Sequence, residues 1–378
     1  MSNVVIAGYV RSAFHLANKG ALRKSRPDDM AGTVIKGLMD KTKVNPADIE
    51  DLIMGCAFPE AEQGFNIGRC VVFVAGLPIS VAGVTVNRFC GSSMQSIHQA
   101  AGAIKMGAGE AFICAGVESM SRIPMGGYNP MPNPGLIDAG SKAYIGMGET
   151  AENLADKYKI DRAKQEAFAV ESHKRAAAAQ AAGKFKDEII PVKGEGGMVD
   201  TDGCIRPDTT PEALAGLKPA FKETGSVTAG TSSPLTDGVS AVLVCSEEYA
   251  KKNNLKPLAR ILSIAVAGCA PEIMGIGPVP AAQKALARAG LKLNQIDIIE
   301  LNEAFAAQSL SVVQELGLDL SKTNLDGGAI ALGHPLGASG GRITGKLASL
   351  LQREKKKYGL ATMCIGGGQG IATILEAM

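Results

Sequence analysis

The sequence predicts an α/β protein whose sheet is mostly parallel. Short apolar runs bounded by glycine, such as DLIMG and AFICAG, alternate with segments of helical periodicity, which is the pattern of βα units. Only 4% of the residues are aromatic, tryptophan is absent, and 46 glycines suit close-packed layers of helices and strands. At 378 residues the chain can bury more than one core, so we expect two or three domains.

The first part of the chain contributes strands and helices in strict alternation. Residues 4–10 (VVIAGYV) form a strand, residues 28–42 a helix, and DLIMG and VTVNRF the next two strands. After Cys90, apolar residues recur at helical spacing from residue 94 to residue 104, and AFICAG follows as a buried strand. Cys90 therefore lies where a strand gives way to a helix.

The character of the chain changes between residue 118 and about residue 234. Four prolines punctuate a stretch rich in glycine and methionine, and one long helix is expected from about 161 to 182. An irregular insertion of this length is typical of a separate lid or loop domain.

Alternation resumes in the last part of the chain. AVLVCSE, ARILSIAVAG, IIEL and LATMCIGGG read as strands, and a helix follows NEAF. Both outer parts have a strand, a glycine-rich turn with a reactive side chain (Cys90 or His334), a helix, and a buried strand that ends in glycine. We interpret this as a weak internal duplication, which would bring two sets of strand ends together where α/β proteins hold their sites.

Charge and cysteine usage exclude several classes of protein. Lysine plus arginine total 39 against 37 acidic residues, with no basic tail, so neither nucleic acid nor a membrane surface is an expected partner. No C-x-x-C pair occurs among eight cysteines, so we expect reduced thiols and no metal site. The N-terminus lacks the features of a signal peptide and the C-terminal LEAM is no peroxisomal signal, so we expect a cytoplasmic protein.

Nucleotide-binding loops are poorly supported. GGRITGK, residues 340–346, matches G-x-x-x-x-G-K, but Leu347 replaces the Ser or Thr that would hold magnesium, and no apolar strand precedes the loop. No G-x-G-x-x-G follows a strand, which argues against a Rossmann cofactor site.

Cys90 is the candidate nucleophile. A helix N-terminus offers free backbone N–H groups that lower the pKa of a thiol and can hold an oxyanion, and Gly91 leaves room for a substrate. Taken alone, the pattern fits a small core residue equally well.

Of four histidines, His334 is the candidate catalytic one. It stands in GGAIALGHPLGASGGR, a turn that could present an imidazole rigidly. We expect His98 to be a packing residue, His173 to be solvated on a charged helix, and His15 to have no chemical neighbours.

Two further strand ends carry polar side chains or thiols. Asn302 follows the strand IIEL and could hold a water or a carbonyl, whereas Glu303 could simply cap the next helix. Cys364 precedes Gly366 at another strand end and could act as an acid and a base.

Four motifs, VNRFCGSS, NEAFAAQ, GGAIALGHPLGASGGR and CIGGGQG, resemble those of the thiolases in order and separation, and the resemblance runs from Val4 to the C-terminus. Thiolases cleave or form 3-ketoacyl-CoA thioesters. The resemblance implies a thiolase fold, with two duplicated βαβαβαββ halves in a five-layer αβαβα core. It divides the chain into residues 1–117 (completed by about 235–254), a CoA-binding loop domain 118–234 and a second half 255–378.

The resemblance also implies roles for the candidate residues. Cys90 would carry the acyl group, His334 would activate it, and Cys364 would move a proton on or off the α-carbon of acetyl-CoA. His334 with a water held by Asn302 would form one oxyanion hole, and the N–H groups of Cys90 and Gly366 the other. CoA and acyl-CoA would be substrates, with no permanently bound cofactor.

Four more residues are implied for substrate binding, with less specific motifs. Ser233 would lie beside the pantetheine and Arg206 near the adenine and phosphate end of CoA. Met147 and Phe305 would line the acyl pocket. Arg206 could also be an ordinary surface charge.

The substrate type is predicted from positions where these motifs differ from those of many short-chain biosynthetic thiolases. CGSS, GTSS and ESMSRIPMGG are more similar to degradative 3-ketoacyl-CoA thiolases than to biosynthetic ones, and acetyl-CoA acetyltransferase is the runner-up. A non-catalytic acyl-CoA or lipid binder is a further alternative, but it should lack a catalytic residue, whereas Cys90, Asn302, His334 and Cys364 are all present. A ketoacyl synthase usually has a Cys-His-His set, and Asn302 and Cys364 argue against it. The family is usually a homodimer or homotetramer, sometimes with a β-oxidation partner subunit.

Overall fold

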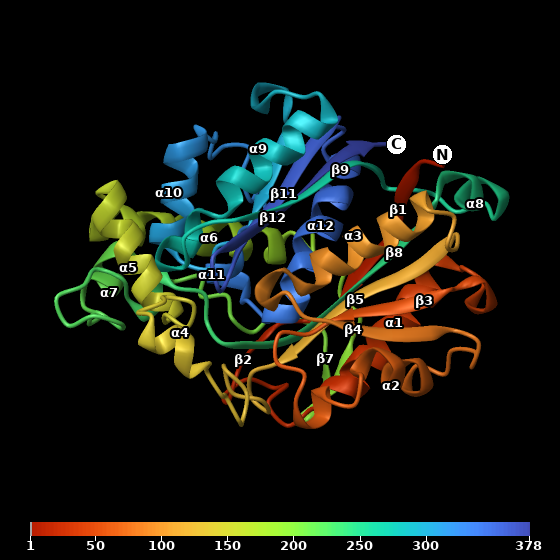
Figure 1. The fold of residues 1–378 in the computed structure, drawn as a ribbon, viewed down its shortest axis with the longest axis horizontal. Helices are drawn as coiled ribbons and strands as arrows, with labels where there is room; N and C mark the ends of the chain where they lie inside the picture. The colour runs from red at the N-terminus through yellow and green to blue at the C-terminus, as the bar shows by residue number, and fades with distance from the viewer. Residues whose placement is uncertain (1) are drawn as a thin grey trace.

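The computed structural model describes residues 2–378, and ten strands form its main sheet (Figure 1). Nine of them are neighbours in the order β10-β11-β12-β9-β1-β8-β5-β3-β4, and β2 pairs with β8 at the side. Their bounds are β1 Val4–Arg11, β2 His15–Leu16, β3 Asp51–Gly55, β4 Ala82–Val86, β5 Ala111–Ser119, β8 Thr236–Ser246, β9 Ala259–Gly268, β10 Ile298–Leu301, β11 Tyr358–Ile365 and β12 Gln369–Ala377.

The prediction of a mostly parallel sheet is wrong, because the sheet is mixed. Strand β3 pairs parallel with β4 and β5, and β10 pairs parallel with β11, but all the other pairs are antiparallel. The periodicity of apolar residues indicates the helices that connect parallel strands, but it does not show where a strand turns back as an antiparallel hairpin. The hairpin between β11 and β12 turns through Gly367 and Gly368, which both have positive φ, and glycine adopts such φ values without steric cost.

The expected duplication is confirmed by the strand order. Strands β1, β8, β5 and β3 are neighbours in the same sequence and the same relative senses as β9, β12, β11 and β10. The two arrays meet where β1 pairs with β9 at Val5 and Ile6. The turn with Cys90 and the turn with His334 thus occupy matching places in the two halves.

Helices lie between the two arrays of strands and on both outer faces, which gives five layers in the order αβαβα (Figure 1). Helix α3 (Ser92–Lys105) packs against α12 (Leu336–Arg353) between the halves, and α12 contacts strands of both. Helices α1 (Pro27–Thr42) and α2 (Ile67–Val74) cover the outer face of the first half, and α9 (Pro278–Ala289) covers that of the second, with α10 (Ala306–Leu316) beside it.

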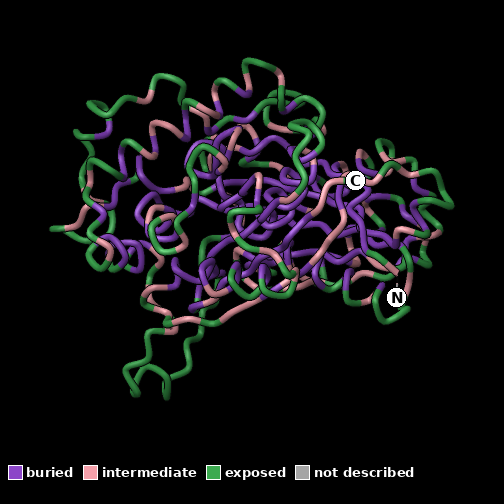
Figure 2. Tube along the Cα trace, turned by 90° about the horizontal axis from the view of Figure 1, so that it is seen from above, coloured by how far each residue is buried: buried purple, intermediate pink, exposed green. Residues whose placement is uncertain are grey.

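Alternate residues of the strands face different apolar cores, as the period of two in a strand requires. On β8, Leu243 packs in the core under α1, whereas Val242 and Val244 pack in the core around α3 and α12. A third core lies between the second half and α9. Figure 2 shows the buried trace in the middle of the molecule and the exposed trace around its edge.

The segment after β5 is an insertion of helices and one small hairpin. The predicted helix over 161–182 is confirmed as α6 (Arg162–Ala181), which begins after an Asp161 side chain that caps the backbone N–H of Lys164. The other elements are α4 Pro134–Asp138, α5 Met147–Tyr158, β6 Val192–Gly194, β7 Gly197–Val199 and α7 Pro211–Ala215, with α8 Glu247–Lys252 and α11 Ala329–Leu332 later in the chain. Within residues 2–378, no helix is both long enough and apolar enough to span a bilayer.

Candidate active site

Cys90 stands in a rigid turn between β4 and α3. It is the middle residue of a 3-10 helix, Phe89–Gly91, that leads directly into α3. The preceding Phe89 has a φ of 43°, which is unfavourable for a bulky residue and needs support from its surroundings. Asn87 supplies that support, because its Oδ1 accepts from the Phe89 N–H at 2.9 Å while its Nδ2 donates to the carbonyl of Ala57 at 3.0 Å.

The thiol of Cys90 is weakly acidic in the free protein. Burial raises its pKa to about 12, and the backbone N–H groups of Gly366 and of Cys90 itself only partly offset this, while the charge of Glu118 adds to it. The expectation that the helix N-terminus lowers the pKa of this thiol is therefore wrong for the free protein, because desolvation outweighs it. Ionisation of Cys90 needs a base.

The contacts of His334 favour the neutral ring form that can act as a base. Its Nδ1 lies 2.5 Å from Oγ of Ser339, and that hydroxyl donates its one proton to the carbonyl of Pro335 at 3.0 Å. The Ser339 oxygen must then accept, so we assign the proton of the neutral ring to Nδ1 and the lone pair to Nε2. Burial, with a smaller contribution from the charge of Arg342, lowers the pKa of His334 to about 3, which keeps the ring neutral.

The turn that carries His334 is held from both sides. Gly333 has a φ of 100°, and the His334 N–H donates to Oγ1 of Thr236 at 3.0 Å. Gly341 of α12 donates its N–H to Oγ of Ser93 in α3 at 2.7 Å. This bond joins the N-terminal parts of the two central helices.

A small apolar cluster brings the Cys90 and His334 turns together. The side chain of Cys90 packs against a cluster that contains Ala57 and Leu336, and Leu336 is two residues beyond His334. The structure thus places the candidate nucleophile and the turn of the candidate base in one packed unit.

Asn302 lies at the end of β10, fully buried, with its Nδ2 3.4 Å from Nε2 of His334. Its Oδ1 has no hydrogen-bond partner in residues 2–378. A buried amide oxygen is costly to leave unsatisfied, so this atom suits a bound water or a substrate group.

The neighbouring Glu303 does not cap α10. Its carboxylate accepts from Ser172, from Asn324 and from the N–H of Ile330 at the start of α11. The residue therefore ties the insertion to the second half, whereas α10 has no side-chain cap.

Cys364 and Gly366 close the site on the side of β11. Cys364 is 1% exposed, and burial first and the proximity of Cys90 second raise the pKa of its thiol. Gly366 lies beside Met147, because a Cβ at this position would come 3.3 Å from the Met147 sulfur. A thiol that keeps its proton at neutral pH can act as an acid.

Of the residues predicted for substrate binding, three lie in one neighbourhood. Met147 and Phe305 pack in the same apolar cluster as Cys364. Ser233 is adjacent, because its N–H and its hydroxyl both donate to the carbonyl of Ala304, at 2.9 and 3.0 Å.

Arg206 has a different environment, and the prediction that His173 is solvated is wrong. His173 is fully buried on α6, and its two ring nitrogens lie 3.1 Å from the backbone nitrogen and from Nη2 of Arg206. Burial, followed by the charge of Arg206, lowers the pKa of His173 to about 4. Helix α6 buries His173 and Glu166 although its other charged side chains are exposed or half-buried, and the number of charged residues does not reveal which of them face inward.

The other histidines are structural. His98 is buried, as expected of a packing residue, and its Nε2 lies 2.8 Å from Oγ1 of Thr373. His15 does have a polar neighbour, contrary to expectation, since its Nε2 lies 2.9 Å from the carbonyl of Thr201.

Sequence reasoning missed Glu118, Thr236 and Ser339. Glu118 is a charged residue inside β5, where every residue is buried, and a charge in an otherwise apolar strand is the signal that could have found it. The two hydroxyl residues carry no such signal, because their importance depends on contacts that form only in the fold.

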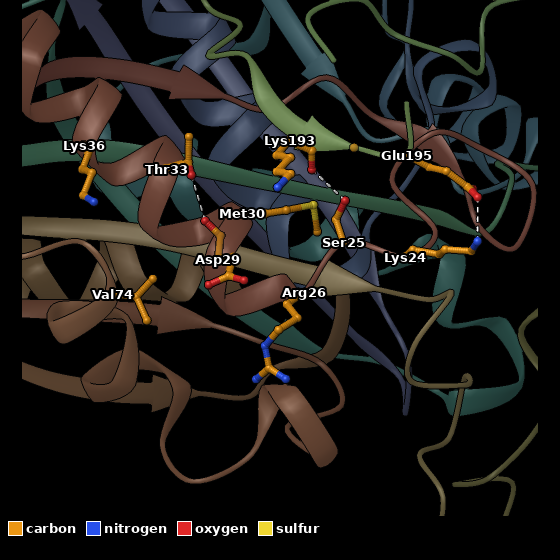
Figure 3. Close-up of a pocket in the computed structure, with 11 residues that line it drawn as sticks. Lys24, Ser25, Arg26, Asp29, Met30, Thr33, Lys36, Val74, Lys193 and Glu195 are labelled. Carbon is orange, nitrogen blue, oxygen red and sulfur yellow. Dashed lines mark hydrogen bonds and ion pairs between the residues drawn. The ribbon is translucent and has the colours of Figure 1, made fainter. Parts of the chain in front are cut away.

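A separate cavity of about 570 Å³ lies between the start of α1 and the hairpin of β6 and β7 (Figure 3). Lys24, Arg26, Lys36 and Lys193 line it, and Glu195 offsets part of this charge through an ion pair with Lys24 at 2.6 Å. None of the candidate catalytic residues lines this cavity. Within residues 2–378, no group of three or more His, Cys, Asp or Glu residues is placed to hold a metal ion.

Comparisons with known proteins give matches over almost the whole chain. The family model "Thiolase, N-terminal domain" matches residues 4–248 and "Thiolase, C-terminal domain" matches residues 255–377. The 3-ketoacyl-CoA thiolase of Vibrio vulnificus (strain YJ016) is 50% identical over 386 residues, and that of Bacillus subtilis (strain 168) is 46% identical over 389, each match covering 100% of both chains. The crystal structure of human mitochondrial 3-ketoacyl-CoA thiolase in complex with CoA has a TM-score of 0.91 at 41% identity and covers 100% of this chain and 98% of that one.

Proposed function

The chain belongs to the thiolase family and is an acyltransferase, and from this premise we propose that it cleaves 3-ketoacyl-CoA with CoA by way of an acyl group on Cys90. The observation that carries the proposal is the setting of His334, whose Nδ1 lies 2.5 Å from Oγ of Ser339 and whose Nε2 lies 3.4 Å from the amide nitrogen of Asn302. From these contacts we assign a neutral ring with its lone pair on Nε2. A thiol with a pKa of about 12 needs such a base.

In the first half of the reaction His334 takes the proton of Cys90, and the thiolate attacks the 3-keto carbon. The C2–C3 bond then breaks, and its electron pair forms the enolate of acetyl-CoA. Cys364 donates its proton to C2, which releases acetyl-CoA and leaves the shortened acyl group as a thioester on Cys90.

In the second half the Cys364 thiolate removes the proton of an incoming CoA thiol, and the CoA sulfur attacks the acyl group. The shortened acyl-CoA leaves, and Cys90 recovers its proton from His334. The protonated His334 and a water on Oδ1 of Asn302 stabilise one developing oxyanion, and the N–H groups of Cys90 and Gly366 stabilise the other.

We assign CoA and acyl-CoA as substrates and no permanently bound cofactor. Ser233 donates to the carbonyl of Ala304, and the preceding Ser232 pairs with Phe305, which supports a role of Ser233 next to the pantetheine. Met147 and Phe305 lie in the apolar cluster of Cys364, which supports an acyl pocket there. Arg206 is exposed and its guanidinium lies against a neutral His173, so its charge stays available for a phosphate. The gap between the two family-model matches, at residues 248 and 255, supports a second half that starts near residue 255.

We further assign a homo-oligomer in the cytoplasm. Strand β4 is the edge of the sheet, and the exposed apolar side chains of Phe65, Ile79 and Val84 lie on or near it. An unprotected edge of this kind readily pairs with another chain, so we assign β4 to contact with a second copy.

The test is CoA-dependent thiolysis of 3-ketoacyl-CoA substrates from four to about sixteen carbons, with Cys90→Ala as the blank. Activity that extends to long chains supports the proposal. Activity confined to acetoacetyl-CoA would make the protein an acetyl-CoA acetyltransferase, and no activity at all would favour a non-catalytic acyl-CoA binder.

A further inference from the structure

Glu118 is a buried carboxylate with an unusually complete set of donors. It lies in β5 at 1% exposure. Its Oε2 accepts from the N–H groups of Ala57 at 2.8 Å and of Gly337 at 2.9 Å, and its Oε1 accepts from Nε2 of Gln63 at 2.7 Å and from the N–H of Phe58 at 3.3 Å.

These four partners of Glu118 are N–H groups, which can only donate, and the thiol of Cys56 adds a long, weak contact to Oε1 at 3.8 Å. A protonated carboxyl would turn an O–H toward one of them and lose that bond, so the geometry fits the ionised form. An amide in place of the carboxylate would likewise set an NH2 group against a donor.

One of these bonds reaches the turn of the candidate base. Gly337 belongs to the first turn of α12 and is three residues beyond His334, and an anion at a helix N-terminus is favourable. The helix can approach β5 this closely only because residue 337 is glycine, since a Cβ there would come 2.4 Å from the carbonyl oxygen of Val117.

A second bond reaches the turn of the candidate nucleophile. Ala57 donates its N–H to Glu118, and the carbonyl of the same residue accepts from Asn87, whose Oδ1 holds the strained Phe89 beside Cys90. The ring of Phe58 also packs against that of Phe89, with 6.1 Å between centroids. Glu118 is thus connected to Cys90 through two short chains of contacts.

We propose that Glu118 is a positioning residue that holds the Cys90 turn and the His334 turn at the separation that proton transfer between them requires. This inference rests on the function proposed above for those two residues. A single carboxylate, that of Glu118, would then align two turns that belong to different halves of the molecule and lie far apart in sequence.

The same carboxylate also affects the thiol electrostatically. Its negative charge contributes to the raised pKa of Cys90. Removal of the charge should therefore make Cys90 more acidic while it makes acyl transfer slower. Local opening of the site would also expose Cys90 and speed its alkylation, so a variant that keeps the charge but shifts its position is needed to separate the two causes.

The experiment compares the full-length protein with its Glu118→Gln and Glu118→Asp variants, and with Asp297→Asn as a matched control. Asp297 also accepts from two backbone N–H groups, those of Lys357 and Tyr358, but in the second half away from the site. The amount of acyl-enzyme gives the concentration of active sites, and the rate of thiolysis is divided by it to give turnover per site. Alkylation of Cys90 by iodoacetamide at about pH 8 is followed by peptide mass spectrometry.

For Glu118→Gln we expect turnover per site to fall at least about tenfold with little change in KM, and alkylation of Cys90 to become at least about threefold faster. For Glu118→Asp, which keeps the charge but shortens the reach, we expect slower turnover and unchanged alkylation. Asp297→Asn should leave both values unchanged.

Unchanged turnover per site in both Glu118 variants would overturn the inference, as would slower turnover of Glu118→Gln without faster alkylation. If Glu118→Gln does not fold by circular dichroism, Glu118→Asp decides alone, and full turnover per site in that variant would overturn the inference. Cys90→Ala is measured in parallel, and turnover retained there would remove the proposed function itself, independently of the Glu118 results.

Discussion

The hydroxyl of Ser339 lies 2.5 Å from Nδ1 of His334 and donates its own proton to the carbonyl of Pro335. Because that proton is directed to Pro335, we assign the hydroxyl as the acceptor from the imidazole, and this assignment leaves Nε2 as the ring nitrogen that receives the proton of Cys90. Because both residues belong to one short segment at the start of α12, the tautomer is built into the local fold.

We expect Ser339→Ala to lower kcat by about 10- to 100-fold with little change in KM, because the ring loses the partner that keeps the proton on Nδ1. Steady-state thiolysis measures both values. Ser349→Ala is the matched control, because Ser349 is on the same helix and also donates to a carbonyl four residues earlier, that of Gly345. A Ser339→Ala variant with wild-type kcat would refute the tautomer assignment.

The pH dependence of Cys90 alkylation should show a weakly acidic thiol. With a pKa of about 12, the thiolate fraction rises about tenfold per pH unit between about pH 6 and pH 9, and no plateau is reached. Peptide mass spectrometry after short exposure to iodoacetamide measures the rate at each pH. In urea-unfolded protein the same peptide should show a midpoint near the ordinary value of about 8.5. A plateau below about pH 8 in the folded protein would contradict burial as the dominant influence.

The ion pairs of Asp326 should make stability depend on pH. Burial opposes ionisation of this carboxyl, but Arg353 at 2.6 Å and Lys346 at 2.9 Å outweigh it and hold the pKa at about 2. A lowered folded-state pKa means that the stabilisation is present above the unfolded value of about 4 and is lost as the pH falls toward 2. We expect Asp326→Asn to reduce the free energy of unfolding by about 2 kcal/mol at pH 7 and by much less near pH 2.

Urea unfolding of the two proteins at both pH values checks this expectation. Asp138→Asn, which alters an exposed carboxylate in α4, serves as the control and should change little at either pH. An equal loss of stability at pH 7 and near pH 2 for Asp326→Asn would show that charge is not the cause.

A double variant, Ile79→Lys with Val84→Lys, should convert an oligomer to monomers, because it places charges at the exposed edge strand β4. Analytical ultracentrifugation measures the mass. Met198→Lys is the control, since Met198 is 64% exposed but lies on the small β6–β7 hairpin. A double variant with the mass of the wild-type protein would exclude β4 as the interface.

Much of the architecture could be predicted from the chain. The predicted bounds of the long helix α6 agree with the structure within one residue at each end, and the side chain of Asp161 caps its first turn. The Cys90 junction could also be predicted, since a strand-like run, a glycine-serine turn and a helical pattern follow one another. The mixed sense of the sheet could not, because the return strands β8 and β12 have the same apolar composition as parallel ones.

The electrostatic character of the site could not be predicted from the sequence either. The pKa of Cys90 depends on packing by residues far along the chain, among them Glu118 and Gly366, whereas the helix N-terminus is a local feature. His173 was misjudged for a related reason, because the segment around residue 206 covers it and no periodicity reveals that contact.

The central claim is that Cys90 carries the acyl group, and intact and peptide mass spectrometry test it most directly. The protein is mixed with a 3-ketoacyl-CoA in the absence of free CoA, and CoA is then added. We expect the mass of the shortened acyl group on the peptide that contains Cys90, no adduct in Cys90→Ala, and loss of the adduct when CoA is added. An acyl group on any other residue, or continued turnover by Cys90→Ala, would contradict the account.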